Sequence, residues 1–161
     1  HRKILKNEPI TIGCAICVEG YLSDHTRTFC IGSLPDEFEY AYASCCNVLD
    51  DILNNLKPDT ECSKLFELAI NIMSENPMKD GFLGLSEKKS RFLGHGIGLE
   101  VNEKPVIGSG QEYPLGNNIT LALEPKAVIQ GKGMVGIENT YWIHDDSVEK
   151  FIDTDDSLIT I

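Results

Sequence analysis

The chain lacks any apolar segment long enough to cross a lipid bilayer. A membrane-spanning helix needs about 20 consecutive apolar residues, and no run in these 161 residues approaches that length. The chain starts at His1, and no apolar core of a signal peptide follows this residue. We therefore expect a soluble protein with no membrane partner.

Basic residues are scarce and scattered along the chain. The sequence has 14 Lys and Arg against 25 Asp and Glu, which gives a formal net charge of -11. A nucleic-acid groove needs clustered Lys and Arg to neutralise phosphates. The composition therefore argues against a nucleic-acid partner, and an acidic surplus is typical of a soluble surface.

Cysteine is too dilute for a disulfide scaffold. Six cysteines stand at irregular intervals in 161 residues, whereas small secreted domains carry dense, regular cysteine patterns. Cys14 and Cys17 have the spacing of a metal or redox pair, but they lie in an apolar run that predicts a strand, where they would point to opposite faces. No second pair completes a zinc site. We expect reduced thiols and a cytoplasmic location.

Two segments have the periodicity of helices that bury one face. In residues 36–56, apolar side chains recur every three or four positions, directly after Pro35. A second helix is predicted to follow Asp59-Thr60 and to end before Pro77.

Short apolar runs on either side of the two helices predict strands. Residues 9–20 and 26–32 would form a hairpin, and after a linker at 81–90 we expect strands within 94–101, 119–129, 134–143 and 150–152. This order, without βαβ repetition, predicts an α+β fold: a mixed, mainly antiparallel sheet covered by helices. Residues 1–161 would belong to a single domain.

Four side chains that can bind a divalent cation stand in separate strand-like segments: Asp24, His95, Glu124 and Glu138. Glu124 and Glu138 interrupt runs that resemble buried strands, and burying a carboxylate is costly unless a cation compensates it. A glycine on either side of His95 would let a ligand or another chain segment approach the imidazole. The other two candidates for chemistry, His25 and His144, are expected to be exposed loop or strand-end residues.

The same residues carry a resemblance to a known superfamily. Residues 20–29, GYLSDHTRTF, resemble its GYxSDxTRT segment, and residues 94–99, GHGIGL, resemble its histidine motif. Glu124-Pro125 and residues 136–139, GIEN, resemble its two glutamate motifs. With four motifs in the same order, the chain resembles the pita-bread superfamily of methionine aminopeptidases, Xaa-Pro peptidases and creatinases. It is most similar to the Xaa-Pro dipeptidase and aminopeptidase branch of the M24-type metallopeptidases.

This resemblance implies a fold, a cofactor and a reaction. The chain would be the C-terminal portion of a pita-bread domain, and that domain would be incomplete. Asp24 and Glu138 would bridge metal ions such as Mn, Co, Zn or Fe, and His95 and Glu124 would hold the first ion. Metal-activated water would hydrolyse the first bond of a peptide substrate, with Glu124 moving the proton. Superfamily members are often homodimers, so a homodimer is one option.

Three positions depart from the superfamily pattern. Gly13 stands in place of the first metal aspartate, so we expect one ion rather than two. Asn102 stands in place of a second histidine near the substrate; we predict a catalytic role for it, although its amide can donate a hydrogen bond but cannot titrate. Gly136 stands where Xaa-Pro peptidases often have arginine.

Three functions fit these residues. The first is a metal-dependent peptidase of the Xaa-Pro dipeptidase or aminopeptidase type, weakened by the three departures. The second is a non-catalytic module with the same fold that binds a peptide or a protein. The third, and least favoured, is a creatinase-like, metal-independent hydrolase in which His95 would be the general base.

Overall fold

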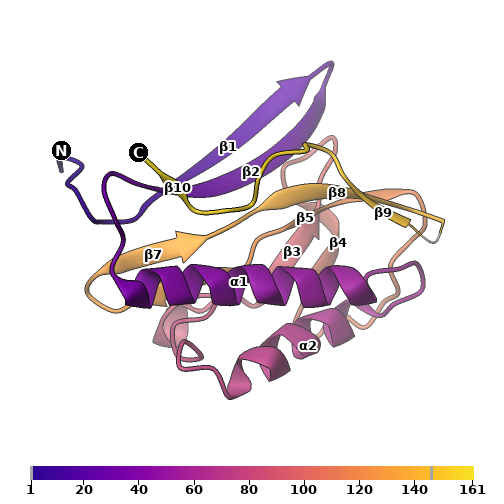
Figure 1. Ribbon diagram of the computed structural model, residues 1–161. Coiled ribbons are helices and arrows are strands. Elements are labelled where there is room, and N and C mark those ends of the chain that lie inside the picture. The colour runs from indigo at the N-terminus through magenta and orange to yellow at the C-terminus, as the bar shows by residue number, and fades with distance from the viewer. Residues whose placement is uncertain (1, 146) are drawn as a thin grey trace.

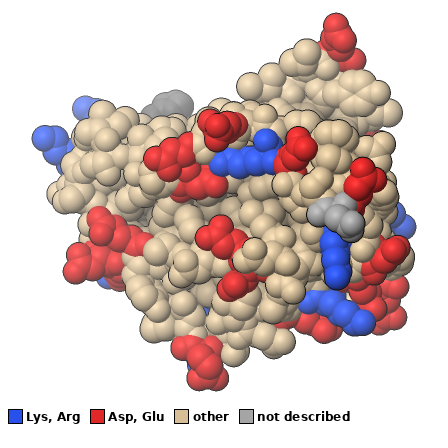
Figure 2. Space-filling model, turned by 45° about the vertical axis from the view of Figure 1, so that its right-hand side comes forward, with Lys and Arg blue, Asp and Glu red and all other residues tan. Residues whose placement is uncertain are grey.

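The computed structural model describes residues 2–145 and 147–161 of the chain. Helices α1 (Asp36–Asn55) and α2 (Cys62–Ser74) lie side by side beneath the strands in the view of Figure 1. Within these residues, no helix is both long and apolar enough to cross a membrane. Acidic side chains recur over the whole face shown in Figure 2, with basic ones lying among them.

The two helices form where their apolar periodicity predicts them. Residues of the predicted stripe of α1 are buried against the sheets, among them Phe38, Cys45 and Ile52. In α2, Leu65 and Met73 are buried in the same core. Each helix therefore covers the sheets with one face and leaves its polar face in water.

The strands form three small sheets. The five-stranded sheet has the order β4-β3-β5-β8-β9 and consists of β3 (Phe92–Gly96), β4 (Glu103–Gly108), β5 (Ile119–Leu123), β8 (Asn139–His144) and β9 (Ser147–Lys150). A hairpin joins β6 (Lys126–Ile129) to β7 (Gly133–Gly136), and the third sheet has the order β1-β2-β10, from β1 (Ile10–Val18), β2 (Tyr21–Cys30) and β10 (Ile159–Thr160). All paired strands are antiparallel except β2 and β10, so the predicted mixed, mainly antiparallel arrangement is confirmed.

Two predicted strands are each broken in two, and each break contains a glutamate. The run 119–129 divides into β5 and β6 at Glu124-Pro125, and the run 134–143 divides into β7 and β8 at Ile137-Glu138. At each break the chain passes between the five-stranded sheet and the β6–β7 hairpin. The two carboxylates therefore come from the same junction between sheets.

Several predicted boundaries were wrong. Strand β2 begins at Tyr21 rather than residue 26, β3 ends at Gly96 rather than near 101, and β9 lies at 147–150 rather than 150–152. Strand β4 was not among the predicted strands, and it contains Pro105. The fold accepts this proline because β4 is the edge of its sheet, where a missing backbone donor is tolerated.

The predicted linker 81–90 also contributes to the core. Phe82 is 2% exposed and forms an isolated bridge with Ala127, and a short helix, η1 (Ser86–Lys88), follows. Hydrophobic residues in this irregular segment are therefore packed like those of the strands.

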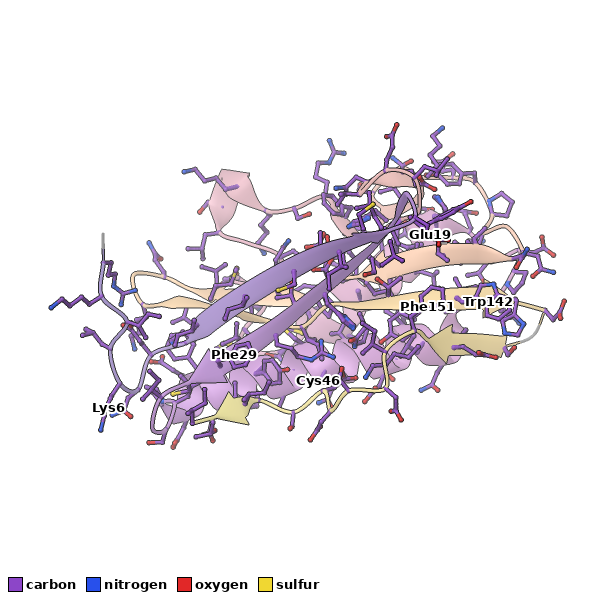
Figure 3. All side chains as sticks on the ribbon, turned by 90° about the horizontal axis from the view of Figure 1, so that it is seen from above. Lys6, Glu19, Phe29, Cys46, Trp142 and Phe151 are labelled. Carbon is purple, nitrogen blue, oxygen red and sulfur yellow. The ribbon has the colours of Figure 1, made fainter. Side chains whose placement is uncertain are left out.

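The β1–β2 hairpin extends beyond the layer of helices and sheets, with Glu19 at its far end (Figures 1 and 3). On one face of β1, Ile12 and Ile16 are exposed. Gly13 lies on the opposite face, because neighbouring residues of a strand point to opposite sides. The site described below lies on the Gly13 side.

Candidate metal centre

Three of the four predicted ligands form a tight cluster. One potential ligand atom from each of Asp24, His95 and Glu138 lies within 4.8 Å of the others. Glu124 adjoins the same imidazole: its Oε1 atom is 3.8 Å from His95 Nε2, and Glu138 Oε1 is 3.9 Å from that nitrogen. The structure therefore brings together all four side chains, which lie far apart in the sequence.

The alternation of β2 places Asp24 in the cluster. Asp24, Thr26 and Thr28 share one face of the strand, because successive side chains alternate between faces. Backbone hydrogen bonds in both directions between Thr26 and Glu138 tie β2 to the β7–β8 break. The Thr140 hydroxyl also donates to the Asp24 carbonyl over 2.9 Å.

His95 is held by close packing between two strands. It is 3% exposed, and β3 lies between β4 and β5. A Cβ atom on Gly94 would lie 2.4 Å from the Ala122 carbonyl oxygen, and one on Gly96 would lie 2.4 Å from that of Lys104. These glycines therefore allow neighbouring strands, rather than a ligand, to approach.

The imidazole of His95 is oriented for metal binding through one nitrogen. Its Nδ1 atom lies 3.1 Å from the Gly96 carbonyl oxygen, which can only accept a hydrogen bond. This contact favours the tautomer that has its proton on Nδ1, which leaves the lone pair of Nε2 directed at the carboxylates.

Each of the three carboxylates has one oxygen engaged by a protein donor. The Thr26 hydroxyl donates to Glu138 Oε2 over 2.6 Å, and the His25 backbone N–H donates to Asp24 Oδ1 over 2.9 Å. The ammonium group of Lys126 donates to Glu124 Oε2. The glutamate oxygens that face His95, both Oε1, are not the oxygens engaged in these bonds.

The site disfavours negative charge in the absence of a cation. The pKa of Glu138 is raised to about 7, chiefly by burial and also by the charges of Glu124 and Asp24, against the lowering effect of the hydrogen bond from Thr26. A set of carboxylate oxygens and one imidazole nitrogen is the donor chemistry of a divalent cation. The described residues therefore fit such an ion.

Sequence reasoning missed the residues that support the ligands. Arg27 Nη1 donates to the Glu138 carbonyl over 2.9 Å, and its Nη2 donates to Asn139 Oδ1 over 2.7 Å and to Asp156 Oδ1 over 2.9 Å. The prediction for His25 was wrong: it lies within β2, half-buried, and its Nδ1 is 2.9 Å from the Glu138 carbonyl. The alternation of side chains after Asp24 was the available signal for Thr26.

The three residues that depart from the superfamily pattern do not all lie in the same place. Gly13 and Gly136 line a cavity of about 230 Å³ that also contains Glu124, Lys126 and Glu138. Asn102 lies in an exposed bend before β4 and does not line this cavity in the part of the chain that the structure describes. Its predicted catalytic role stays a prediction.

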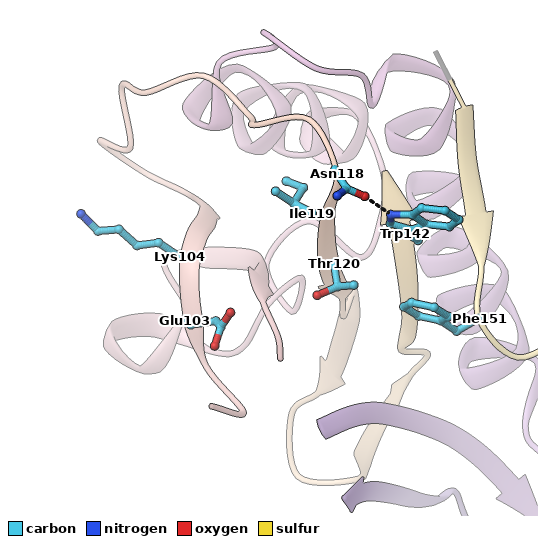
Figure 4. A pocket seen from close by; sticks show the side chains of 7 residues that line it. All are labelled: Glu103, Lys104, Asn118, Ile119, Thr120, Trp142 and Phe151. Atoms are coloured by element: carbon cyan, nitrogen blue, oxygen red, sulfur yellow. Dashed lines mark hydrogen bonds between the residues drawn. The ribbon is translucent and has the colours of Figure 1, made fainter. Parts of the chain in front are cut away.

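A larger hollow of about 520 Å³ is lined by residues of the five-stranded sheet and the segments next to it (Figure 4). Its lining includes Thr120, Trp142 and Phe151, and the Trp142 indole donates to Asn118 Oδ1 over 2.9 Å. Thr120 lies two residues along β5 from Ala122, which pairs with His95. Because alternate residues share a face, this hollow lies on the same side of the sheet as the cluster.

Comparison with known sequences identifies the family. The profile described as metallopeptidase family M24 matches residues 1–145. The chain belongs to metallopeptidase family M24. An Xaa-Pro dipeptidase of Pyrococcus horikoshii is 28% identical over 98% of this M24 chain, and one of Lactobacillus delbrueckii is 29% identical over 94%. The chain spans 43% and 39% of these two relatives.

Solved structures of other proteins have the same fold. A prolidase from Thermococcus sibiricus superimposes with a TM-score of 0.90 and 26% identity, over 100% of this chain and 42% of that one. The N-terminal domain of the FACT complex subunit SPT16 from chickpea, Cicer arietinum, has a TM-score of 0.81 at 16% identity, over 98% and 39% of the chains. The M24 chain therefore has an incomplete pita-bread fold.

Proposed function

We propose that this M24 chain carries the metal centre of a peptidase that removes the residue preceding proline at a peptide N-terminus. The observation that carries the proposal is the convergence of Asp24, His95 and Glu138, with Glu124 against the same imidazole. The similarity to Xaa-Pro dipeptidases supports the choice of substrate.

The roles of the residues follow from their contacts. A divalent cation, with manganese the first to test, would be held by Asp24, His95, Glu124 and Glu138, and it supplies Lewis-acid activation of water and of the substrate carbonyl. Glu124 would accept the proton of the attacking water and return it to the leaving amine. For Asn102 the role rests on its place in the superfamily pattern rather than on a contact: its amide would donate a hydrogen bond to the substrate.

The hollow of Figure 4 is the proposed binding place for the substrate side chain. It lies on the cluster's side of the five-stranded sheet, and Ile119, Trp142 and Phe151 contribute apolar surface to its lining. Apolar and aromatic linings with a few polar groups are typical of small-ligand sites. The pocket therefore favours peptides with an apolar first residue.

The test is a peptidase assay on the natural polypeptide that contains these residues. Metal-stripped protein is supplied with Mn²⁺ and a Leu-Pro dipeptide or a longer Leu-Pro peptide, and release of leucine is followed by mass spectrometry. We expect metal-dependent release that falls at least about 100-fold in Glu138→Gln, because the ion loses a buried ligand. Lys132→Met, which removes an ion pair with Glu37 on the surface, is the matched control and keeps full activity.

A non-catalytic binding module is the second candidate. Gly13 offers no side chain to the cavity, and Lys126 engages an oxygen of Glu124, so the carboxylates are less available for catalysis. Peptide binding without release of leucine, measured by calorimetry on the same metal-loaded preparation, would favour this candidate and overturn the peptidase.

A further inference from the structure

Lys126 is the only basic residue lining the cavity of about 230 Å³ beside the cluster, among the residues that the structure describes. Its ammonium group contacts Glu124 Oε2, on the side of the carboxylate that does not face His95. The corresponding oxygen of Glu138 is engaged by the Thr26 hydroxyl. Each glutamate thus presents one oxygen toward His95 and has the other occupied by a protein donor.

The number of cations that the site can hold depends on which carboxylate oxygens are free to bind them. Two metal ions that share carboxylates lie about 3.5–4 Å apart, and a bridging carboxylate binds one ion through each oxygen. Of the two carboxylates expected to bridge, Asp24 already accepts at Oδ1 from the His25 backbone N–H, and Glu138 accepts at Oε2 from the Thr26 hydroxyl. The Lys126 ammonium group lies against Glu124 Oε2 and lines the same cavity. Gly13, which lines the same cavity, has no side chain to offer as a ligand.

We propose that the Lys126 ammonium group takes the place of a second metal ion, so that the centre holds a single divalent cation. The proposal rests on the metal centre of the proposed function and names the residue that sets its stoichiometry. The net charge of the site is consistent with one divalent cation. The carboxylates of Asp24, Glu124 and Glu138 are compensated by one divalent ion together with one ammonium group.

The β6–β7 hairpin makes room for this lysine. Lys126 and Gly136 are paired across the two strands, and both line the cavity. A Cβ atom on Gly136 would lie 3.0 Å from Lys126 Cβ and 3.1 Å from the Pro125 carbonyl oxygen, which is tighter than ordinary contact. Because Gly136 has no side chain, the Lys126 side chain has room to contact Glu124.

The experiment counts metal ions in four proteins. The natural polypeptide that contains these residues, Gly13→Asp, Lys126→Met and the double variant are stripped of metal and titrated calorimetrically with Mn²⁺, and electron paramagnetic resonance of the loaded samples separates isolated from coupled ions. We expect one isolated ion in the wild type and in each single variant. The double variant gains a carboxylate ligand and loses the competing ammonium group, and the Thr26 hydroxyl can rotate away from Glu138 Oε2. We therefore expect two coupled ions.

The controls separate this proposal from the peptidase proposal. Lys132→Met removes an ammonium group from the same hairpin region and should still bind one ion. Two coupled ions in the wild type, or only one in a double variant whose circular dichroism is native, would overturn the role of Lys126. When a variant does not fold, the number of Mn²⁺ ions bound by the wild type is still informative, because two coupled ions there would overturn the proposal. One ion without peptidase activity would overturn only the proposed function, and no bound ion would overturn both.

Discussion

The Thr26 hydroxyl donates a hydrogen bond of 2.6 Å to Glu138 Oε2, although 112 positions separate the two residues in the chain. The bond holds the carboxylate so that its other oxygen lies 3.9 Å from His95 Nε2. A partner that fixes a ligand in this way usually contributes as much to metal affinity as to structure.

Replacing this hydroxyl should weaken metal binding. In Thr26→Val the side chain keeps its shape but cannot donate to Glu138 Oε2. We expect the Mn²⁺ affinity measured by calorimetry to fall about 10- to 100-fold, the usual effect of losing such a partner. Thr26→Ser retains the hydroxyl and should restore most of the affinity. Equal affinity in the valine variant would contradict the role of this bond.

Neutralising Glu138 should stabilise the metal-free protein at alkaline pH. The pKa of Glu138 is raised from 4.5 to about 7, so ionisation costs folding free energy above pH 4.5, and the cost is complete above pH 7. At about 1.4 kcal/mol per pKa unit, Glu138→Gln should gain up to about 3 kcal/mol at pH 8. The gain should shrink below about 1 kcal/mol at pH 5, as checked by urea unfolding in chelator.

Truncating the proposed substrate pocket should weaken substrate binding alone. Phe151 is 54% exposed and lines the hollow shown in Figure 4, so Phe151→Ala should leave stability nearly unchanged. For Leu-Pro peptides we expect KM to rise about 3- to 10-fold with kcat unchanged, because the lost contact is made equally in the ground state and transition state. An unchanged KM would remove the hollow from the substrate site.

Removing Arg27 should loosen the C-terminal segment. Its side chain is 12% exposed, and its guanidinium group joins Asn139 to Thr154 and Asp156 through hydrogen bonds of 2.7–2.9 Å. We expect Arg27→Met to lower the free energy of unfolding by about 2 kcal/mol, because charged hydrogen bonds are lost. Amide exchange should quicken in residues 154–160. The exposed Arg91→Met is the control and should change stability by less than about 0.5 kcal/mol.

The sequence predicted the helices more accurately than the strands. The 3.6-residue repeat from residue 36 onwards identifies α1 locally, because the helix satisfies its own hydrogen bonds. Strand β4 was not predicted: its hydrogen bonds are made with another strand, and a strand that contains proline is compatible only with a sheet edge, which the pairing showed. The sequence showed that Glu124 and Glu138 interrupt apolar runs, but not that the chain passes from one sheet to another at these residues.

The sequence by itself determined the two helices, the family and the four side chains able to bind a cation, because periodicity and motifs are properties of consecutive residues. Only the tertiary structure decided which oxygen of each carboxylate is engaged. The Thr26 hydroxyl of strand β2 donates to Glu138. The Lys126 ammonium group donates to Glu124 on the other side of Pro125, beside Gly136, which has no side chain. The first contact joins residues 112 positions apart. The second spans only two positions, but it depends on the close packing of Gly136 beside Lys126 across the β6–β7 pair.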